Sequence, residues 1–128
     1  MKTRYTVVLS MIAGAALGGA AIQGLHAQAK PPIYYVAEID VTNLDGWTKE
    51  YSPKAQALIK ENGGRILAAG QNVTSIEGEP PKKRVVIQVW DNMDQIKAWR
   101  SSAKFKELMP LREKFGKARS FTVEGLAN

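Results

Sequence analysis

Short stretches rich in β-branched and aromatic residues, with apolar side chains at alternate positions, predict four β-strands in this chain. The predicted strands are residues 33–41, 65–69, 83–90 and 118–124. A weaker stretch, 73–77, is expected to continue the second of these as an irregular strand. One face of strand 33–41 carries Ile33, Tyr35, Ala37, Ile39 and Val41. We expect that face to pack against helices, because successive side chains of a strand point to opposite sides.

Two regions between these strands have apolar residues at every third or fourth position, which predicts helices. The first begins at a cap, Thr42 or Asn43, and ends at Gly63-Gly64, where a glycine can take positive φ. Pro53 falls inside it, so we expect a kink or a restart there. The second region is divided into one helix over 92–100 and another that begins at Ser101 or Ser102 and ends at Gly116.

This order of strands and helices is that of a split βαβ unit. The sequence therefore predicts an α+β, ferredoxin-like domain, with a mainly antiparallel sheet and its helices on one face. Strand 83–90 is apolar on both faces, and we expect Val36, Val86 and Trp90 to lie on the face without helices. An exposed patch of this kind favours a homodimer in which two sheets pack face to face, a dimeric α/β-barrel.

The first 29 residues have the organisation of a secretory signal peptide. Met1–Arg4 carries two positive charges, an apolar stretch over 7–22 follows, and Ala27-Gln28-Ala29 closes with small residues. Cleavage after Ala29 leaves one domain, residues 30–128, periplasmic or secreted and no longer attached to a membrane. The alternative is a retained membrane anchor, but four glycines between positions 14 and 24 weaken a spanning helix.

Composition then removes several kinds of chemistry. The chain has no cysteine, and its one histidine, His26, lies in the predicted signal. Thiol nucleophiles, histidine bases, Ser-His-Asp triads and most soft-metal sites are excluded, and no disulfide can form. The acidic residues lack the spacing of a calcium loop, so we expect no metal and no cofactor.

The net charge of the mature chain is small. Lys2 and Arg4 account for two of the 18 basic residues, and 16 minus 12 acidic residues gives +4. The basic run Lys82-Lys83-Arg84 lacks the interleaved aromatics of a nucleic-acid surface. The expected partners are therefore a second copy of the chain and a small apolar or anionic ligand, not nucleic acid.

The mature chain resembles the domain of unknown function 1330 family of dimeric α/β-barrel proteins. The matching residues are Tyr35–Asp40, Trp47, Tyr51, Asn62–Arg65, Glu77-Gly78, Arg84–Ile87, the spaced set Ala98-Trp99, Ser102 and Phe105, Leu111-Arg112 and Val123–Gly125. The resemblance implies the fold and the dimer, and it implies no particular activity. Ser102-Ala103-Lys104-Phe105 stands where the family pattern is Ser-Pro-Glu-Tyr, so no role of an acid or phenol is carried over there.

Catalysis, if present, would depend on carboxylates. The weak candidates are Glu38 and Asp40, which share one face of a strand, with Arg84 and Glu124 across the sheet. Paired carboxylates can transfer protons when their environment raises one pKa. The favoured interpretation is an ion-pair network or a solvated strand face.

A ligand pocket would use aromatic residues and one arginine. Tyr35, Trp90 and Trp99 are candidates for its walls, although aromatics at such spacings are more often core. Arg112 lies on a helix stripe that is otherwise apolar and must find an anion. An internal salt bridge is the favoured partner, and a bound carboxylate is the alternative.

Three functions are compatible with these residues. The favoured one is a homodimeric, non-catalytic or small-ligand-binding envelope protein. The alternative is a cofactor-independent enzyme, monooxygenase-like or lyase-like, that acts on a small organic molecule; this rests on fold analogy. A purely structural dimer is the third. Convergence of the charged candidates on one concave site would favour the enzyme.

Overall fold

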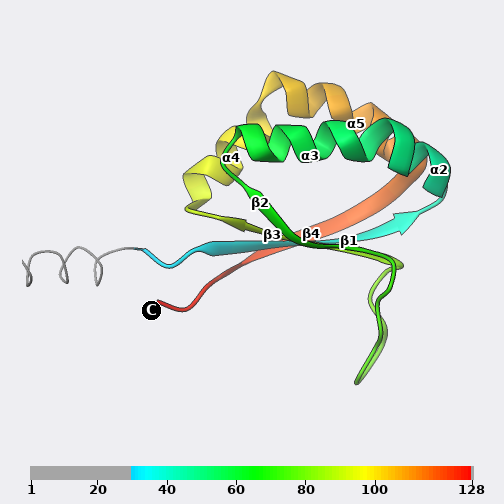
Figure 1. Cartoon of the computed structure of the whole chain (residues 1–128), viewed down its shortest axis with the longest axis horizontal. Coiled ribbons are helices and arrows are strands. Elements are labelled where there is room, and N and C mark those ends of the chain that lie inside the picture. The colour runs from blue at the N-terminus through cyan, green and yellow to red at the C-terminus, as the bar shows by residue number, and fades with distance from the viewer. Residues whose placement is uncertain (1–29, 128) are drawn as a thin grey trace, which may run out of the picture. The chain divides into compact units, whose positions relative to one another are not determined.

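A four-stranded antiparallel sheet lies under a single layer of helices in the computed structural model, which describes residues 30–127 (Figure 1). The predicted signal, residues 1–29 with its cleavage site at Ala29, lies outside the described residues. The strand order is β2-β3-β1-β4. The strands are β1 (Ile33–Val41), β2 (Arg65–Gly70), β3 (Arg84–Trp90) and β4 (Gly116–Glu124).

The helices all lie on one side of this sheet (Figure 1). They are α2 (Leu44–Gly46), the π-helical turn η1 (Trp47–Tyr51), α3 (Ser52–Glu61), α4 (Met93–Ser101) and α5 (Ala103–Phe115). The predicted α+β, ferredoxin-like arrangement is thereby confirmed. Within residues 30–127, no helix is long and apolar enough to cross a membrane.

Local signals explain where the helices begin and end. The side chains of Asn43, Asn92 and Ser102 cap α2, α4 and α5, each accepting a hydrogen bond from a backbone N–H three residues ahead. Gly63, at φ 96°, ends the α3 region in a conformation that suits glycine. The expected restart at Pro53 is found: α3 begins at Ser52 with Pro53 in its first turn, directly after the π-helical turn η1.

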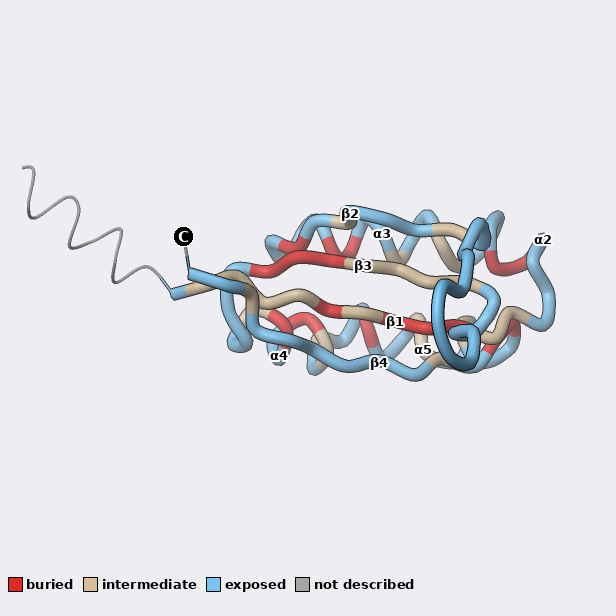
Figure 2. Tube along the Cα trace, turned by 90° about the horizontal axis from the view of Figure 1, so that it is seen from below, coloured by how far each residue is buried: buried red, intermediate tan, exposed pale blue. Residues whose placement is uncertain are grey.

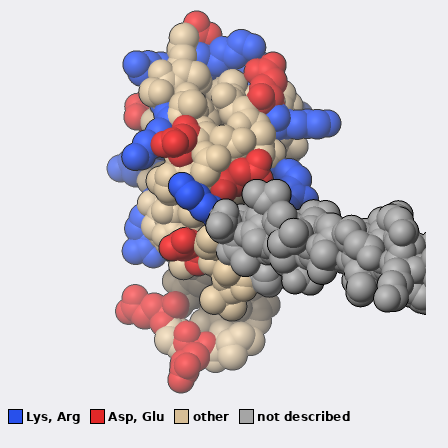
Figure 3. Space-filling model, turned by 90° about the vertical axis from the view of Figure 1, so that its left-hand side faces the viewer, with Lys and Arg blue, Asp and Glu red and all other residues tan. Residues whose placement is uncertain are grey.

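The predicted strand over 73–77 is wrong. The β2–β3 ladder ends at Gly70↔Val85, and residues 71–83 leave the sheet as an arm with no ladder partner. Figure 1 shows this arm on the side of the sheet away from the helices. Its residue Ile76 is 92% exposed. Acidic side chains gather at the lower end of Figure 3, where the arm lies, and the arm carries Glu77 and Glu79.

The predicted positions of Val86 and Trp90 are also wrong. β3 pairs with β1 in the register Ala37↔Val86 and Ile33↔Trp90, and directly opposed residues share a face. Both side chains therefore lie under the helices, and Trp90 is only 1% exposed. Because β3 is apolar on both faces, its sequence did not reveal which face turns inward.

The face without helices, called the open face below, nevertheless carries a group of apolar side chains. It carries Val36, Val85, Ile87, Phe121 and Val123, as the β1–β3 and β1–β4 registers require. Phe121 is 48% and Val123 54% exposed. Figure 2 shows burial concentrated on the central strands β1 and β3, with β2 and β4 more exposed.

The core lies between the sheet and the helices. The inward face of β1 is confirmed, since Tyr35, Ala37 and Ile39 are buried there. Three large rings of the core contact one another in a row: the ring centroids of Trp90 and Trp99 are 5.0 Å apart, and those of Trp99 and Phe105, which meet edge to face, are also 5.0 Å apart. These contacts join α4 and the start of α5 to β3. Trp99 also lines a cavity.

Candidate functional site

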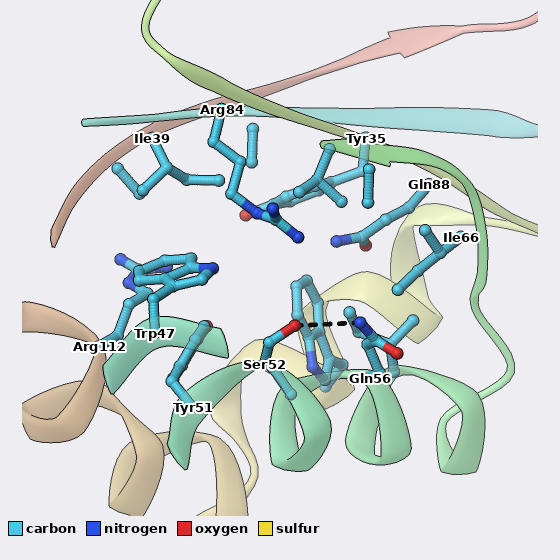
Figure 4. Close-up of a pocket in the computed structure, with 17 residues that line it drawn as sticks. Tyr35, Ile39, Trp47, Tyr51, Ser52, Gln56, Ile66, Arg84, Gln88 and Arg112 are labelled. Carbon is cyan, nitrogen blue, oxygen red and sulfur yellow. Dashed lines mark hydrogen bonds between the residues drawn. The ribbon is translucent and has the colours of Figure 1, made fainter. Parts of the chain in front are cut away.

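A cavity of about 60 Å³ lies between the sheet and the helices (Figure 4). Its floor comes from β1 and β3, its roof from η1 and α3, and α5 contributes one arginine. The lining residues are Tyr35, Ala37, Ile39, Trp47, Tyr51, Ser52, Ala55, Gln56, Ile59, Ile66, Ala69, Arg84, Val86, Gln88, Trp99, Arg112 and Ala118.

Aromatic rings form much of the wall. Trp47 and Tyr51, from the π-helical turn, have ring centroids 4.5 Å apart. Tyr35 and Trp99 meet edge to face at 5.3 Å. The hydroxyl of Tyr35 donates to Ser120 at 2.8 Å and accepts from Arg100 at 3.2 Å, so this ring is held in place from outside the cavity.

Two arginines line the same cavity. In Figure 4, Arg84 extends from β3 toward the helices, and Arg112 enters from α5. The Nε of Arg84 is buried and has no hydrogen-bond partner. Among residues 30–127 neither arginine takes part in an ion pair. The favoured prediction of an internal salt bridge for Arg112 is therefore wrong within the part of the chain that the structure describes.

Tyr51 places a phenol near these charges. Burial raises its pKa above the usual value of 10.0, and the positive charge of nearby Arg112 offsets only part of that rise. Tyr51 is therefore neutral at physiological pH. In that state its hydroxyl is a hydrogen-bond donor for a ligand and a poor base.

The cavity meets the surface between α3 and β2. Gln56 of α3 and Ala69 of β2 both line it and are both exposed. The amide of Gln56 donates to the Ser52 hydroxyl at 3.0 Å, drawn as the dashed line in Figure 4. This polar pair marks the entrance. Deeper in the cavity, the side-chain amide oxygen of Gln88 accepts a hydrogen bond from the Trp90 indole N–H at 2.8 Å.

The carboxylate candidates are not gathered at the cavity. Glu38 and Asp40 lie on the open face, because Ala37 and Ile39, which alternate with them along β1, point inward. Glu38 pairs there with Arg119 and accepts from the Lys82 backbone N–H at 3.2 Å. The hydrogen bond from Arg119 holds the pKa of Glu38 below its usual value of 4.5.

The remaining candidates separate in the same way. Glu124 lies exposed at the end of β4, opposite Ile33. Arg84 lies opposite Ile39, on the helix-covered side of the sheet. The structure therefore does not bring the four catalytic candidates together in one site. Within the described residues there is also no cluster of three or more metal-ligating side chains.

The ligand-pocket candidates fall closer together. Tyr35, Trp99 and Arg112 line the cavity, whereas Trp90 lies behind Trp99 and does not. Sequence reasoning missed Trp47 and Tyr51 as site residues. The available signal was a helix stripe with steps of four, completed by Ala55 and Ile59 and flanked by the polar residues Ser52 and Gln56.

The arrangement is suited to binding rather than to proton transfer. The lining contains two guanidinium groups, the phenols of Tyr35 and Tyr51, and no carboxylate or histidine. Cationic groups in an aromatic cavity attract an anion with an apolar part. A general base would have to come from the ligand itself.

Comparison with known proteins agrees with this architecture. The family model described as "Domain of unknown function (DUF1330)" matches residues 32–126. No curated protein matches the chain. Among solved structures, a protein of unknown function from Rhodopseudomonas palustris is similar over 77% of this chain and 85% of its own, with 12% identity and a TM-score of 0.63.

Two further structures share the fold. The cofactor-independent oxygenase SnoaB from Streptomyces nogalater matches 77% of this chain and 96% of its own, at 11% identity and a TM-score of 0.57. A protein of unknown function from Bacteroides fragilis, described as dimeric and ferredoxin-like, matches 73% of this chain and 95% of its own, at 10% identity and a TM-score of 0.50. At these identities the likeness is one of fold.

Proposed function

We propose a function for this protein from the residues of its own cavity. The chain belongs to the DUF1330 family, and its fold is shared by an oxygenase and by proteins of unknown function, so the fold alone does not select one function. The protein is an exported homodimer that binds a small organic molecule in the cavity between its sheet and its helices. The observation that carries the proposal is the cavity itself: a concave, aromatic space with a few polar groups is the usual form of a small-molecule site.

Ligand binding can be tested by tryptophan fluorescence, since Trp47 and Trp99 form part of the cavity wall. Protein isolated from cells is first screened by native mass spectrometry for a co-purifying molecule, and that molecule is then titrated back. Ala55→Phe fills the cavity and should abolish the response. Ala98→Phe, at an exposed position of α4, is the matched control and should retain it. A response that survives Ala55→Phe would place the ligand elsewhere.

The homodimer is supported by the open face. Val36, Val85, Ile87 and Phe121 line a broad hollow there, together with Val73 and the prolines of the arm. A lone subunit would expose this apolar surface to water, and a second copy packed face to face covers it. The fold of a protein described as dimeric is consistent with that arrangement.

Export is supported by the sequence alone, through the basic start, the apolar stretch and the Ala27-Gln28-Ala29 triplet. Intact mass spectrometry of the protein isolated from the periplasm or medium should give Lys30 as the first residue. Protein that begins at Met1 would contradict both the cleavage site and the periplasmic or secreted location.

A cofactor-independent enzyme is the second candidate, favoured by the fold shared with the oxygenase SnoaB. The cavity wall offers no carboxylate or histidine as a base, so such an enzyme would act on a substrate that ionises by itself. Oxygen uptake or product formation with the co-purifying molecule would establish this function. Release of that molecule unchanged, on repeated cycles in air, would support binding alone.

A further inference from the structure

Among residues 30–127, Arg84 and Arg112 differ from the buried Glu38 and from the half-buried Arg100. Glu38, which is 8% exposed, is paired with Arg119. Arg100, beside the core, donates to the Tyr35 hydroxyl at 3.2 Å and lies 4.5 Å from the centroid of the Phe105 ring. The two cavity arginines have neither an ion pair nor a carboxylate among the lining residues. A half-buried cation without a counter-ion is unfavourable unless an anion joins it.

The Arg84 guanidinium has unused hydrogen-bonding capacity. Its Nε is buried and without a partner in the protein. A guanidinium offers its N–H groups as a planar fork, and a carboxylate has the matching pair of acceptor oxygens. Arg84 comes from the sheet and Arg112 from α5, so an anion between them would be held from two different elements.

The neutral groups near the arginines complement this charge. Tyr51, kept protonated by burial, can donate to an oxygen of the anion. Ser52 and Gln56 stand at the entrance and already bond to each other. Around them the wall is apolar, with the faces or edges of Trp47 and Trp99.

The size and polarity of the cavity restrict the ligand further. A volume of about 60 Å³ is several times what one water needs, so a molecule of a few non-hydrogen atoms fits. An inorganic phosphate or sulfate would bring no apolar surface to the aromatic wall. A short organic acid brings both the charge and the apolar part.

We propose that the cavity binds a small organic monocarboxylate, with its carboxylate held by Arg84 and Arg112 and its hydrocarbon part against the aromatic wall. This rests on the proposed small-molecule function and names the chemical class of its ligand. It also supplies a counter-ion for two arginines that have no ion-pair partner within residues 30–127.

The test is isothermal titration calorimetry of the purified protein with butyrate, its neutral amide butyramide, and inorganic phosphate. Butyrate should bind at least tenfold more tightly than either of the others. Arg84→Met and Arg112→Met should each weaken butyrate binding at least tenfold. Arg84→Lys, which keeps the charge but loses the fork, should fall between. Arg119→Met, on the open face, is the control and should stay within about twofold of the original affinity.

The outcomes separate the ligand class from the proposed function. Equal binding of butyrate and butyramide, both lost in Ala55→Phe, would overturn the carboxylate and leave small-molecule binding intact. Tighter binding of phosphate than of butyrate would assign the site to an inorganic anion and would also overturn it. If a co-purifying molecule binds in Ala55→Phe as well as in the original protein, the cavity is not the site and both proposals fail. Melting curves of each variant establish that it is folded.

Discussion

The two faces of the sheet differ in whether their arginine side chains form ion pairs within the chain. On the helix-covered face, aromatic and aliphatic side chains surround a cavity in which Arg84 and Arg112 have no ion-pair partner in residues 30–127. On the open face, the apolar side chains are half exposed, and Arg119 is paired with Glu38. The arginine of the open face thus has a counter-ion within the described residues, on the face where we expect a second copy. The two cavity arginines have none, at the place where we expect a ligand.

A single step along β1 separates the two situations. Arg84 lies opposite Ile39, whose side chain points inward, and Arg119 lies opposite Glu38, whose side chain points outward. The alternation of the strand therefore decides whether an arginine meets a carboxylate or an apolar cavity. The same residue type can serve as a structural partner on one face and as a ligand-binding group on the other.

The largest expected difference between the faces is in stability. Phe105→Ala removes a buried core ring, 6% exposed, and should lower the free energy of unfolding by about 3–5 kcal/mol at any protein concentration. Phe121→Ala removes a ring that is 48% exposed and should act mainly through the dimer, so its effect should shrink on dilution. Urea denaturation at two protein concentrations measures both. A concentration-independent loss of similar size in Phe121→Ala would contradict the contrast.

The next effect is on the oligomeric state. Phe121→Glu places a charge on the open face, beside Val36, and should convert the dimer to a monomer, because an unpaired charge is costly in an apolar interface. Size-exclusion chromatography with light scattering should show twice the monomer mass for the original protein and the monomer mass for the variant. Lys106→Glu, on the exposed side of α5, is the control and should remain dimeric. If the original protein is itself a monomer, the proposed face-to-face dimer is wrong.

A smaller change is expected for a substitution in the cavity, and there the free energy of unfolding should rise instead of fall. Arg84→Met replaces an unpartnered cation with an apolar side chain of similar length and should raise the free energy of unfolding without ligand by about 1 kcal/mol. Arg119→Met should lower it instead, because it leaves Glu38 without its partner. Denaturation of ligand-free protein compares the two. A loss of stability in Arg84→Met would mean that this arginine has a structural task.

The smallest effect is a pH dependence on the open face. Since the pKa of Glu38 is lower in the folded protein than its ordinary value of 4.5, the folded state binds fewer protons there. The stabilisation is present above pH 4.5 and is lost as the pH falls through the lower, folded pKa. The melting temperature should fall less steeply below pH 4.5 in Glu38→Gln and in Arg119→Met. If the melting temperature falls as steeply with pH in both variants as in the original protein, the Glu38–Arg119 pair does not contribute to the loss of stability in acid.

Sequence patterns predicted one face of the sheet better than the other. β1 alternates apolar and mixed residues, so its inward face, with Tyr35 and Ile39, could be assigned directly. β3 is apolar on both faces, and only its pairing with β1 decides that Val86 and Trp90 turn inward. The strand predicted over 73–77 failed because β-propensity alone cannot supply a partner strand.

The residues of the site could be predicted only in part, because their partners depend on tertiary packing. Arg112 stood out as a charge on an apolar stripe, but whether a carboxylate of the chain reaches it depends on tertiary packing. Trp47 and Tyr51 look like ordinary core residues in the sequence. The π-helical turn that carries both residues is not visible in the period of the helix.

The claim that the two faces have separate tasks is tested most directly by titrating butyrate into the Phe121→Glu variant. Phe121 is not among the residues that line the cavity. We predict a folded monomer that binds butyrate with an affinity within about threefold of the original protein. A folded monomer that no longer binds butyrate, while the original dimer does, would contradict the separation and show that the site needs the second subunit.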